Sequence, residues 1–180
     1  MSLPHSPSLP RGVVAIAVTA AVALHFALPA AAQSTEANVA LIRDYYTAYA
    51  TGDPEAVRPF LAEEVVWRIP GHHPLAGEKR GRDEVVAFFA ALAKGRFRAE
   101  PVFFQAEGDL VVDVHRGWSN VGRGPEVDQL YALMFRIEDG RIVEATNFLT
   151  DMYQSDAFFW ANYPLKPLPQ RLADEMEGRP

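Results

Sequence analysis

The sequence contains no cysteine. Disulfide bonds, thiolate nucleophiles and cysteine-ligated metal sites are therefore excluded, and the fold must rest on its apolar core. Basic residues are also scarce, since 17 Lys and Arg oppose 23 Asp and Glu and give a formal net charge of −6. An acidic chain without runs of Lys or Arg binds nucleic acids poorly. We therefore expect no nucleic-acid partner.

Charge is almost missing from residues 1–32, where Arg11 is the single charged side chain. An apolar run follows it and ends in three alanines just before Gln33. A positive start, an apolar middle and small residues at the end make up a secretory signal peptide, with cleavage expected after Ala32. The run is short and is interrupted by His25, so no stable membrane span is expected after cleavage. The sequence predicts a periplasmic or secreted protein.

The mature part begins with helical spacing. Apolar residues recur every three or four positions and predict an amphipathic helix over 35–50. Asp53 and Pro54 suit the start of a second, short helix, because Asp caps free N–H groups and Pro fits the first turn. Asp83 is expected to cap a third helix.

Strands are predicted where apolar residues alternate between turn sequences. One strand precedes the third helix and is followed by a loop over 70–81. Four more strands come after that helix, and because short turns join them they must pair antiparallel. The five strands are expected at 64–69, 96–106, 110–121, 127–138 and 141–151. A short helix over 155–160 follows, and then a loose proline-rich tail over 164–180. One helical layer on a bent sheet makes an α+β domain, expected over 33–163, with a concavity between the layers.

Several stretches of this domain resemble a known superfamily. They are Tyr45-Tyr46 with Thr51-Gly52-Asp53, 67–71, 74–77 with Gly81 and Asp83, 135–137 with 139–142 and Glu144, and Asp151 with 158–160. Together they resemble the nuclear transport factor 2-like superfamily, and within it the SnoaL-like branch. The resemblance implies a strongly curved, mostly antiparallel sheet closed by three helices into a cone with an internal apolar pocket. It does not fix the activity, because the superfamily includes isomerases, cyclases, dehydratases, epoxide hydrolases and plain binding proteins.

Tyr45 precedes Asp53 by eight residues, a spacing similar to that of the oxyanion-hole tyrosine in the steroid isomerases of this superfamily. A phenol facing an apolar pocket can donate a hydrogen bond to a developing enolate oxygen. Three tyrosines on one helix favour the plainer interpretation, a core tyrosine. Ile69 stands where those isomerases have their basic Asp, and Leu133, or Ala132 after a slip in register, stands at the second oxyanion donor. Without a base, ordinary steroid isomerase chemistry is not expected.

The epoxide hydrolases of the superfamily carry an Asp on the last strand, and Asn147 stands at that place. They also need an Arg-x-Asp on the third strand, which residues 111–116 do not supply. An amide can position a water molecule but cannot deprotonate it. Epoxide hydrolysis is therefore not expected either.

His115 is the main catalytic candidate. It shares a strand face with Asp113 and Gly117, because side chains repeat every two residues, and the small Gly117 is expected to leave room for a ligand. A SnoaL-type polyketide cyclase works with a His and an Asp on neighbouring central strands, which His115 and Asp128 resemble loosely. The inferred register points Asp128 outward unless a bulge intervenes. A histidine at the sheet surface or in a subunit contact is the other interpretation.

Asp151 is a further catalytic candidate beside Tyr45 and His115, as a buried acid tuned by apolar neighbours. The alternative is that it caps the helix that follows. Residues expected to line the pocket and contact a ligand are Trp67, His73, Tyr131, Phe135 and Asn147. No cofactor is expected. No metal site is expected either, because His72 and His73 are adjacent and point apart.

Two functions remain open for the pocket. The first is a cofactor-free isomerase, cyclase or lyase that acts on a small, mostly apolar carbonyl or polycyclic compound through His115, with Tyr45 and Asn147 as hydrogen-bond partners. The second is a non-catalytic ligand-binding or dimeric assembly module, favoured by the missing Asp residues. Both bind a small molecule in the cavity.

The predicted sheet is apolar on both faces. On the strand over 127–138, the face turned away from the pocket carries Leu130, Ala132 and Met134. Exposing such a set would create a larger apolar patch than monomers usually show, and two-fold pairing is the commonest way to cover one. The superfamily's habit of pairing through the sheet implies the same. We predict a homodimer with Met134 and Trp118 at the contact.

Overall fold

The computed structural model describes residues 30–119, 122 and 124–163, with side chains from residue 35 on. The predicted tail over 164–180 and the predicted signal peptide, apart from 30–32, lie outside the described residues. Among the described residues, no helix combines the length and the apolar character that crossing a membrane requires.

Helices and strands follow one another in the order of an α+β fold, with four consecutive strands after α2. The elements are α1 (Ala30–Ala50), the 3-10 helix η1 (Pro54–Phe60), β1 (Leu61–Ile69), β2 (Gly77–Arg80), α2 (Arg82–Lys94), β3 (Arg98–Glu107), β4 (Leu110–Ser119), β5 (Val127–Glu138), β6 (Arg141–Leu149) and α3 (Met152–Asn162). The predicted fold class is confirmed.

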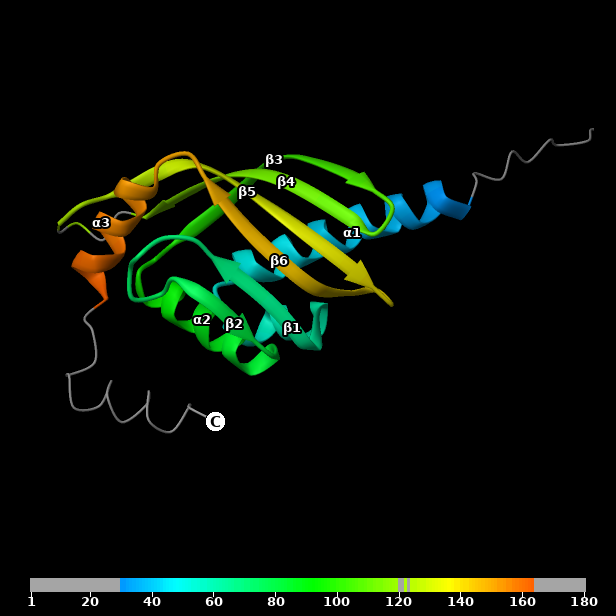
Figure 1. Cartoon of the computed structure of the whole chain (residues 1–180), viewed down its shortest axis with the longest axis horizontal. Helices are drawn as coiled ribbons and strands as arrows, with labels where there is room; N and C mark the ends of the chain where they lie inside the picture. The colour runs from blue at the N-terminus through cyan, green and yellow to red at the C-terminus, as the bar shows by residue number, and fades with distance from the viewer. Residues whose placement is uncertain (1–29, 120–121, 123, 164–180) are drawn as a thin grey trace, which may run out of the picture.

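The six strands form one open sheet in the order β2-β1-β6-β5-β4-β3. β3 to β6 pair antiparallel with their neighbours, as the short turns predict, and β1 joins β6 in parallel. Figure 1 shows the sheet curving over α1 and α2, with α3 at one end. α1 packs on β3 and β4, whereas α2 packs on β1 and β2. The two helices therefore cover different halves of the inner face of the sheet.

The inner face of the sheet carries the core. On β5 every second side chain is buried, and these side chains point at the helices. Tyr45 on α1 packs against Trp67 and Phe135, with ring centroids 6.0 and 5.9 Å apart. Aromatic rings packed edge to face at this spacing fill volume and orient one another. This cluster joins the first helix to the middle of the sheet.

Some predicted boundaries are wrong. Residues 77–80 were expected in a loop but form β2, an edge strand that pairs antiparallel with β1. Its Glu-Lys-Arg sequence shows no apolar alternation, because a strand at the edge of a sheet can be polar throughout. Gly81, not Asp83, occupies the N-cap of α2, and the Asp83 carboxylate pairs with Arg58 at 2.6 Å. Arg96 has a φ of 54°, so the chain turns there and β3 begins at Arg98.

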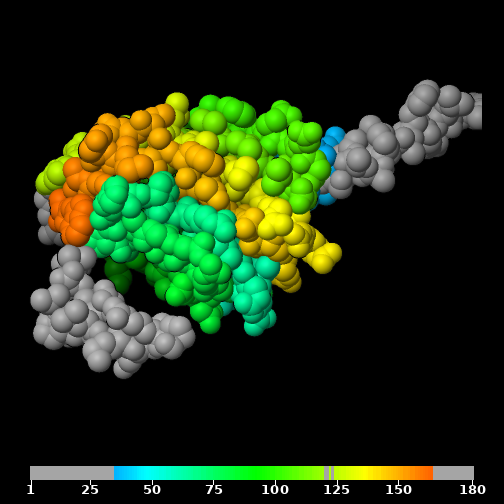
Figure 2. Space-filling view, in the orientation of Figure 1, coloured from blue at the N-terminus to red at the C-terminus, as the bar shows by residue number. Residues whose placement is uncertain are grey.

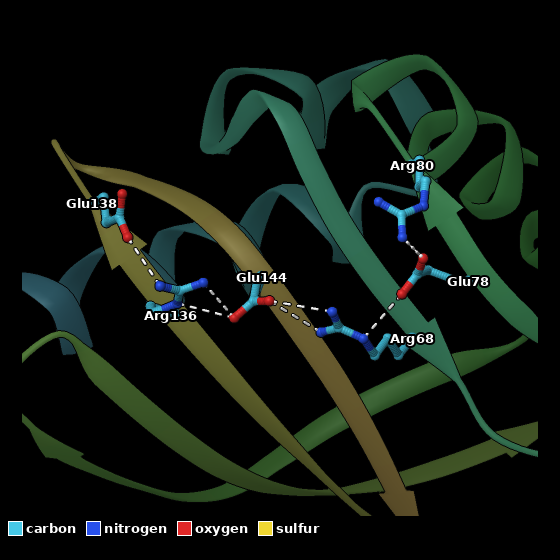
Figure 3. A network of polar contacts seen from close by, with 6 residues as sticks. All are labelled: Arg68, Glu78, Arg80, Arg136, Glu138 and Glu144. Carbon is cyan, nitrogen blue, oxygen red and sulfur yellow. Dashed lines mark hydrogen bonds and ion pairs between the residues drawn. The ribbon is translucent and has the colours of Figure 1, made fainter.

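The outer face of the sheet is polar at one end. A chain of ion pairs crosses β2, β1, β6 and β5 there (Figure 3). Its members are Arg80, Glu78, Arg68, Glu144, Arg136 and Glu138. Exposed ion pairs contribute little individually. Here three of them join neighbouring strands, and the other two lie within a single strand. This end of the outer face is thus covered with charge.

Toward the other end, the outer face becomes apolar. Phe103, Val114, Ala132 and Phe148 form a continuous row, because each is the direct pairing partner of the next. Phe103 is 50% exposed and Phe148 52% exposed. Figure 2 shows the face on which β5 and β6 lie uncovered between β1 and β4. The sequence prediction that both faces of the sheet are apolar is confirmed for this half.

Candidate functional site

A buried Asp–His pair lies on the inner face of β4. Asp113 and His115 are two residues apart, and their side chains therefore point to the same face. His115 Nδ1 lies 2.9 Å from Asp113 Oδ1, and both side chains are almost fully buried. The carboxylate also accepts hydrogen bonds from the Tyr46 hydroxyl and, at 3.2 Å, from the Leu133 backbone N–H. A buried carboxylate with three donors is well satisfied in its charged form.

These contacts fix the tautomer of His115. Because the Asp113 carboxylate only accepts, the contact favours a proton on Nδ1, and in the neutral imidazole Nε2 is then the bare nitrogen. Within the described part of the chain, both hydrogen bonds of His115 use Nδ1. Nε2 is therefore the ring atom that can take a proton from a ligand.

Tyr46 holds this pair from α1. Its hydroxyl contacts both Asp113 and, at 3.1 Å, His115 Nδ1. Burial, and then the neighbouring Asp113 carboxylate, raise the pKa of the Tyr46 phenol well above its ordinary value. Tyr46 therefore stays protonated and donates to Asp113. On its other side the His115 ring stacks on Tyr131, with centroids 5.4 Å apart.

His115 lies in the wall between two small cavities of about 40 Å³ each. Both cavities are lined by Phe88, Leu92, Phe97, His115 and Asn147. A larger groove of about 480 Å³ lies between the end of α1 and the start of β3, and it shares Tyr49, Phe89, Phe97 and Ala99 with the first cavity. Phe97 lines all three spaces. Phe97 is therefore part of the wall between a groove of ligand size and the Asp–His pair.

Most of the pocket residues expected from the sequence line these cavities. Tyr45, Trp67 and Asn147 line the first, while His73, Tyr131 and again Asn147 line the second. Burial raises the pKa of Tyr45 well above its ordinary value, so its hydroxyl is a donor. None of the hydrogen bonds found among the described residues uses that hydroxyl.

Three expectations about the pocket differ from the structure. Phe135 lies behind the wall, fully buried against Trp67. Asp151 is exposed and caps α3 by accepting from the Gln154 N–H at 2.9 Å, the alternative considered for it. A Cβ at Gly117 would lie 2.5 Å from the Tyr131 ring, so that ring fills the space expected for a ligand.

Asp128 does not reach the cavities. It points outward, as the register predicted, and its carboxylate binds the Arg116 guanidinium at 2.7 Å on the outer face. The partner of His115 is instead Asp113 on its own strand, together with Tyr46 from α1. The sequence contained both signals, since Asp113 shares the face of His115 and Tyr46 lies on the apolar stripe of its helix.

His73 is a neutral wall residue. Its ring stacks on Phe159 with centroids 4.3 Å apart, and Nδ1 accepts from the Leu75 N–H at 3.2 Å. Burial lowers the pKa of His73 to about 4. Across residues 30–119, 122 and 124–163, no three His, Asp or Glu side chains lie close enough together to hold a metal ion.

Comparison with known proteins gives four relevant likenesses. A family model described as the SnoaL-like domain matches residues 42–145. An uncharacterized protein of Mycobacterium tuberculosis is 31% identical over 131 residues, which are 70% of this chain and 98% of the relative. The structure of Bal32a, from a soil-derived mobile gene cassette, gives a TM-score of 0.66 at 25% identity and covers 70% of this chain and 98% of its own. A putative SnoaL-like polyketide cyclase from Jannaschia sp. CCS1 gives a TM-score of 0.58 at 19% identity and covers 71% of this chain and 94% of its own. This likeness concerns the fold alone.

Proposed function

The chain belongs to the SnoaL-like domain family, and from that premise we propose that it binds a small, mostly apolar carbonyl compound beside His115 and moves a proton on it without a cofactor. The observation that carries this proposal is the buried Asp113–His115 pair in the cavity wall, where the contact through Nδ1 leaves Nε2 of the neutral imidazole free to accept a proton. A base oriented by a carboxylate is the usual way to prepare an imidazole for proton transfer.

The proposed chemistry uses residues of the first cavity. Nε2 of His115 takes a proton from the carbon next to the ligand's carbonyl. The C–H electron pair forms a carbon–carbon double bond, and the π pair of the carbonyl moves onto its oxygen to give an enolate. Tyr45 donates a hydrogen bond to that oxygen, and Asp113 stabilises the imidazolium that forms. Return of the proton to the same or another carbon gives exchange or isomerisation. The base thus comes from β4, whereas Ile69 leaves the usual isomerase position apolar.

A second candidate function is ligand binding without catalysis. Each cavity beside His115 has a volume of only about 40 Å³, far below that of an ordinary ligand site. A bulky ligand must therefore displace Phe97 and extend into the larger groove. In such a complex the reactive carbon could rest in the groove, away from Nε2, and the protein would act as a carrier.

Mass spectrometry of the protein exported by an expressing bacterium tests both the location and the ligand. We propose export to the periplasm or medium because residues 1–32 have the pattern of a signal peptide. The mass of the denatured protein is expected to equal that of a chain that begins at Gln33. The native spectrum is expected to contain an adduct of a small apolar carbonyl compound. A chain that retains residues 1–32 would contradict export, and a native mass equal to the denatured mass would contradict tight binding.

We also propose that the domain forms a homodimer through the outer face of the sheet. The row from Phe103 to Phe148 exposes large apolar side chains side by side, and Leu130 and Met134 flank it on β5. Trp118 lies further along β4, on the same face as Val114, with the Arg116 guanidinium 4.9 Å from its ring. Burial against a second copy removes this patch from water.

Met134→Lys is expected to convert the dimer into a monomer, because it places a charge directly beside the apolar row. Light scattering at micromolar concentration measures the mass. The matched control is Glu126→Lys, which changes an exposed residue outside the row and should leave the dimer intact. A monomer mass for the unmodified protein would rule out this arrangement.

A further inference from the structure

Two buried polar atoms beside the first cavity have no hydrogen-bond partner in the described part of the chain. They are Trp67 Nε1 and Asn147 Oδ1. Trp67 is only 1% exposed, so its indole N–H is shielded from bulk water. Nearly all buried polar atoms in folded proteins have partners, and an unpaired one costs free energy. Two such atoms at one cavity indicate that something else supplies the partners.

The strand order brings these atoms to one side of the catalytic pair. Trp67 on β1 pairs with Ala145 on β6, and Asn147 lies two residues further along the same face. Asn147 pairs with Leu133 on β5, which pairs in turn with Asp113 on β4. The inner face therefore presents a donor, an acceptor and the catalytic pair in sequence across neighbouring strands.

The two atoms require complementary groups on a ligand. An indole N–H only donates, and an amide oxygen only accepts. We propose that the cavity recognises a flat cyclic ligand with a carbonyl that accepts from Trp67 and a hydroxyl that donates to Asn147. A flat ring suits this wall because aromatic side chains line it, among them Tyr45, Phe88 and Phe89. This inference deepens the proposed function and rests on it.

Four probes with one skeleton test this recognition: tetralin, α-tetralone, tetrahydro-β-naphthol and an α-tetralone that also carries a ring hydroxyl. Each matched group is expected to tighten binding about 3- to 10-fold, the range for one net hydrogen bond. Titrations are followed by nitrogen–proton correlation NMR, which resolves the indole N–H of each tryptophan. The indole N–H signal of Trp67 should move to higher proton frequency when either ketone binds. It should not move when either of the other two probes binds.

Two variants assign each group to its partner. Trp67→Phe removes the N–H and is expected to abolish the preference for ketones over tetralin, while the preference for the hydroxyl persists. Asn147→Leu removes the acceptor and is expected to abolish the preference for the hydroxyl, while the preference for ketones persists. Each effect is the ratio of two Kd values within one variant, so a general loss of packing cancels.

The outcomes separate this inference from the proposed function. Equal binding of all four probes in wild type and variants would overturn the inference, with ordered water as the partner of both atoms, and would leave a general apolar binding site standing. No binding of any probe would overturn both.

Discussion

His115→Gln is expected to lower the rate at which the protein exchanges the α-protons of α-tetralone with solvent by about 10²–10⁴-fold, the usual contribution of a general base. Glutamine can still donate to Asp113, so the carboxylate stays satisfied, but it offers no nitrogen that can take a proton. The loss of α-proton signals in deuterated water, followed by proton NMR, measures the rate at saturating ketone.

His72→Gln is the matched control for that substitution. His72 is 85% exposed and contacts Asp156 at the surface, so its loss should leave the exchange rate unchanged. Binding of the ketone to His115→Gln should persist within a few-fold, because the cavity keeps its volume. An exchange rate in His115→Gln equal to that of wild type would place the base elsewhere and favour the carrier function.

Asp113→Ala is expected to reduce the free energy of unfolding by about 2–5 kcal/mol, because each buried donor left without an acceptor costs about 1–3 kcal/mol. The substitution leaves the Tyr46 hydroxyl, the Leu133 N–H and His115 Nδ1 without their acceptor in a site that water does not reach. Urea denaturation of wild type and variant measures the difference.

Asp128→Ala provides the comparison for Asp113→Ala. Asp128 is also on the central hairpin, but it pairs with Arg116 on the exposed outer face, so its loss should be close to neutral. Equal midpoints for the two variants would show that Asp113 is not the centre of a buried network. Exchange activity should fall in Asp113→Ala as well, because the imidazole loses the group that fixes its tautomer.

Much of the fold could be predicted from the sequence because two kinds of local signal agree. Alternation on β5 placed Tyr131 and Leu133 inward and Leu130 and Met134 outward, and the register has them there. Short turns with glycine fixed the antiparallel order of β3 to β6. The edge strand β2 lacked both signals, since its residues are polar and its partner β1 lies earlier in the chain.

The site was only partly predictable, because side-chain partners depend on contacts distant in sequence. His115 could be chosen from its strand face, but its partner was sought across the hairpin at Asp128 rather than two residues back at Asp113. Tyr46 was missed as a site residue because the resemblance directed attention to Tyr45. Adjacent helix positions point about a quarter-turn apart, and only the packing of α1 on β4 decides which one reaches His115.

The unpartnered atoms of Trp67 and Asn147 could not have been found from the sequence. Both residues were expected in the pocket wall, yet whether an indole N–H or an amide oxygen has a partner depends on every neighbour at once. Asp151 could be described from the sequence alone. The local preference of Asp for helix N-caps predicted its position correctly, whereas the expectation that it is a buried acid in the pocket did not.

In the neutral His115 ring, the contact with Asp113 places the proton on Nδ1 and leaves Nε2 bare. Long-range nitrogen–proton NMR of the neutral imidazole, assigned by comparison with His115→Gln, observes this directly. The geometry predicts the Nδ1–H tautomer in the wild-type protein. Observation of the Nε2–H tautomer would contradict it, because Nδ1 would then have no proton to give Asp113 and Nε2 no free pair to accept one from a ligand.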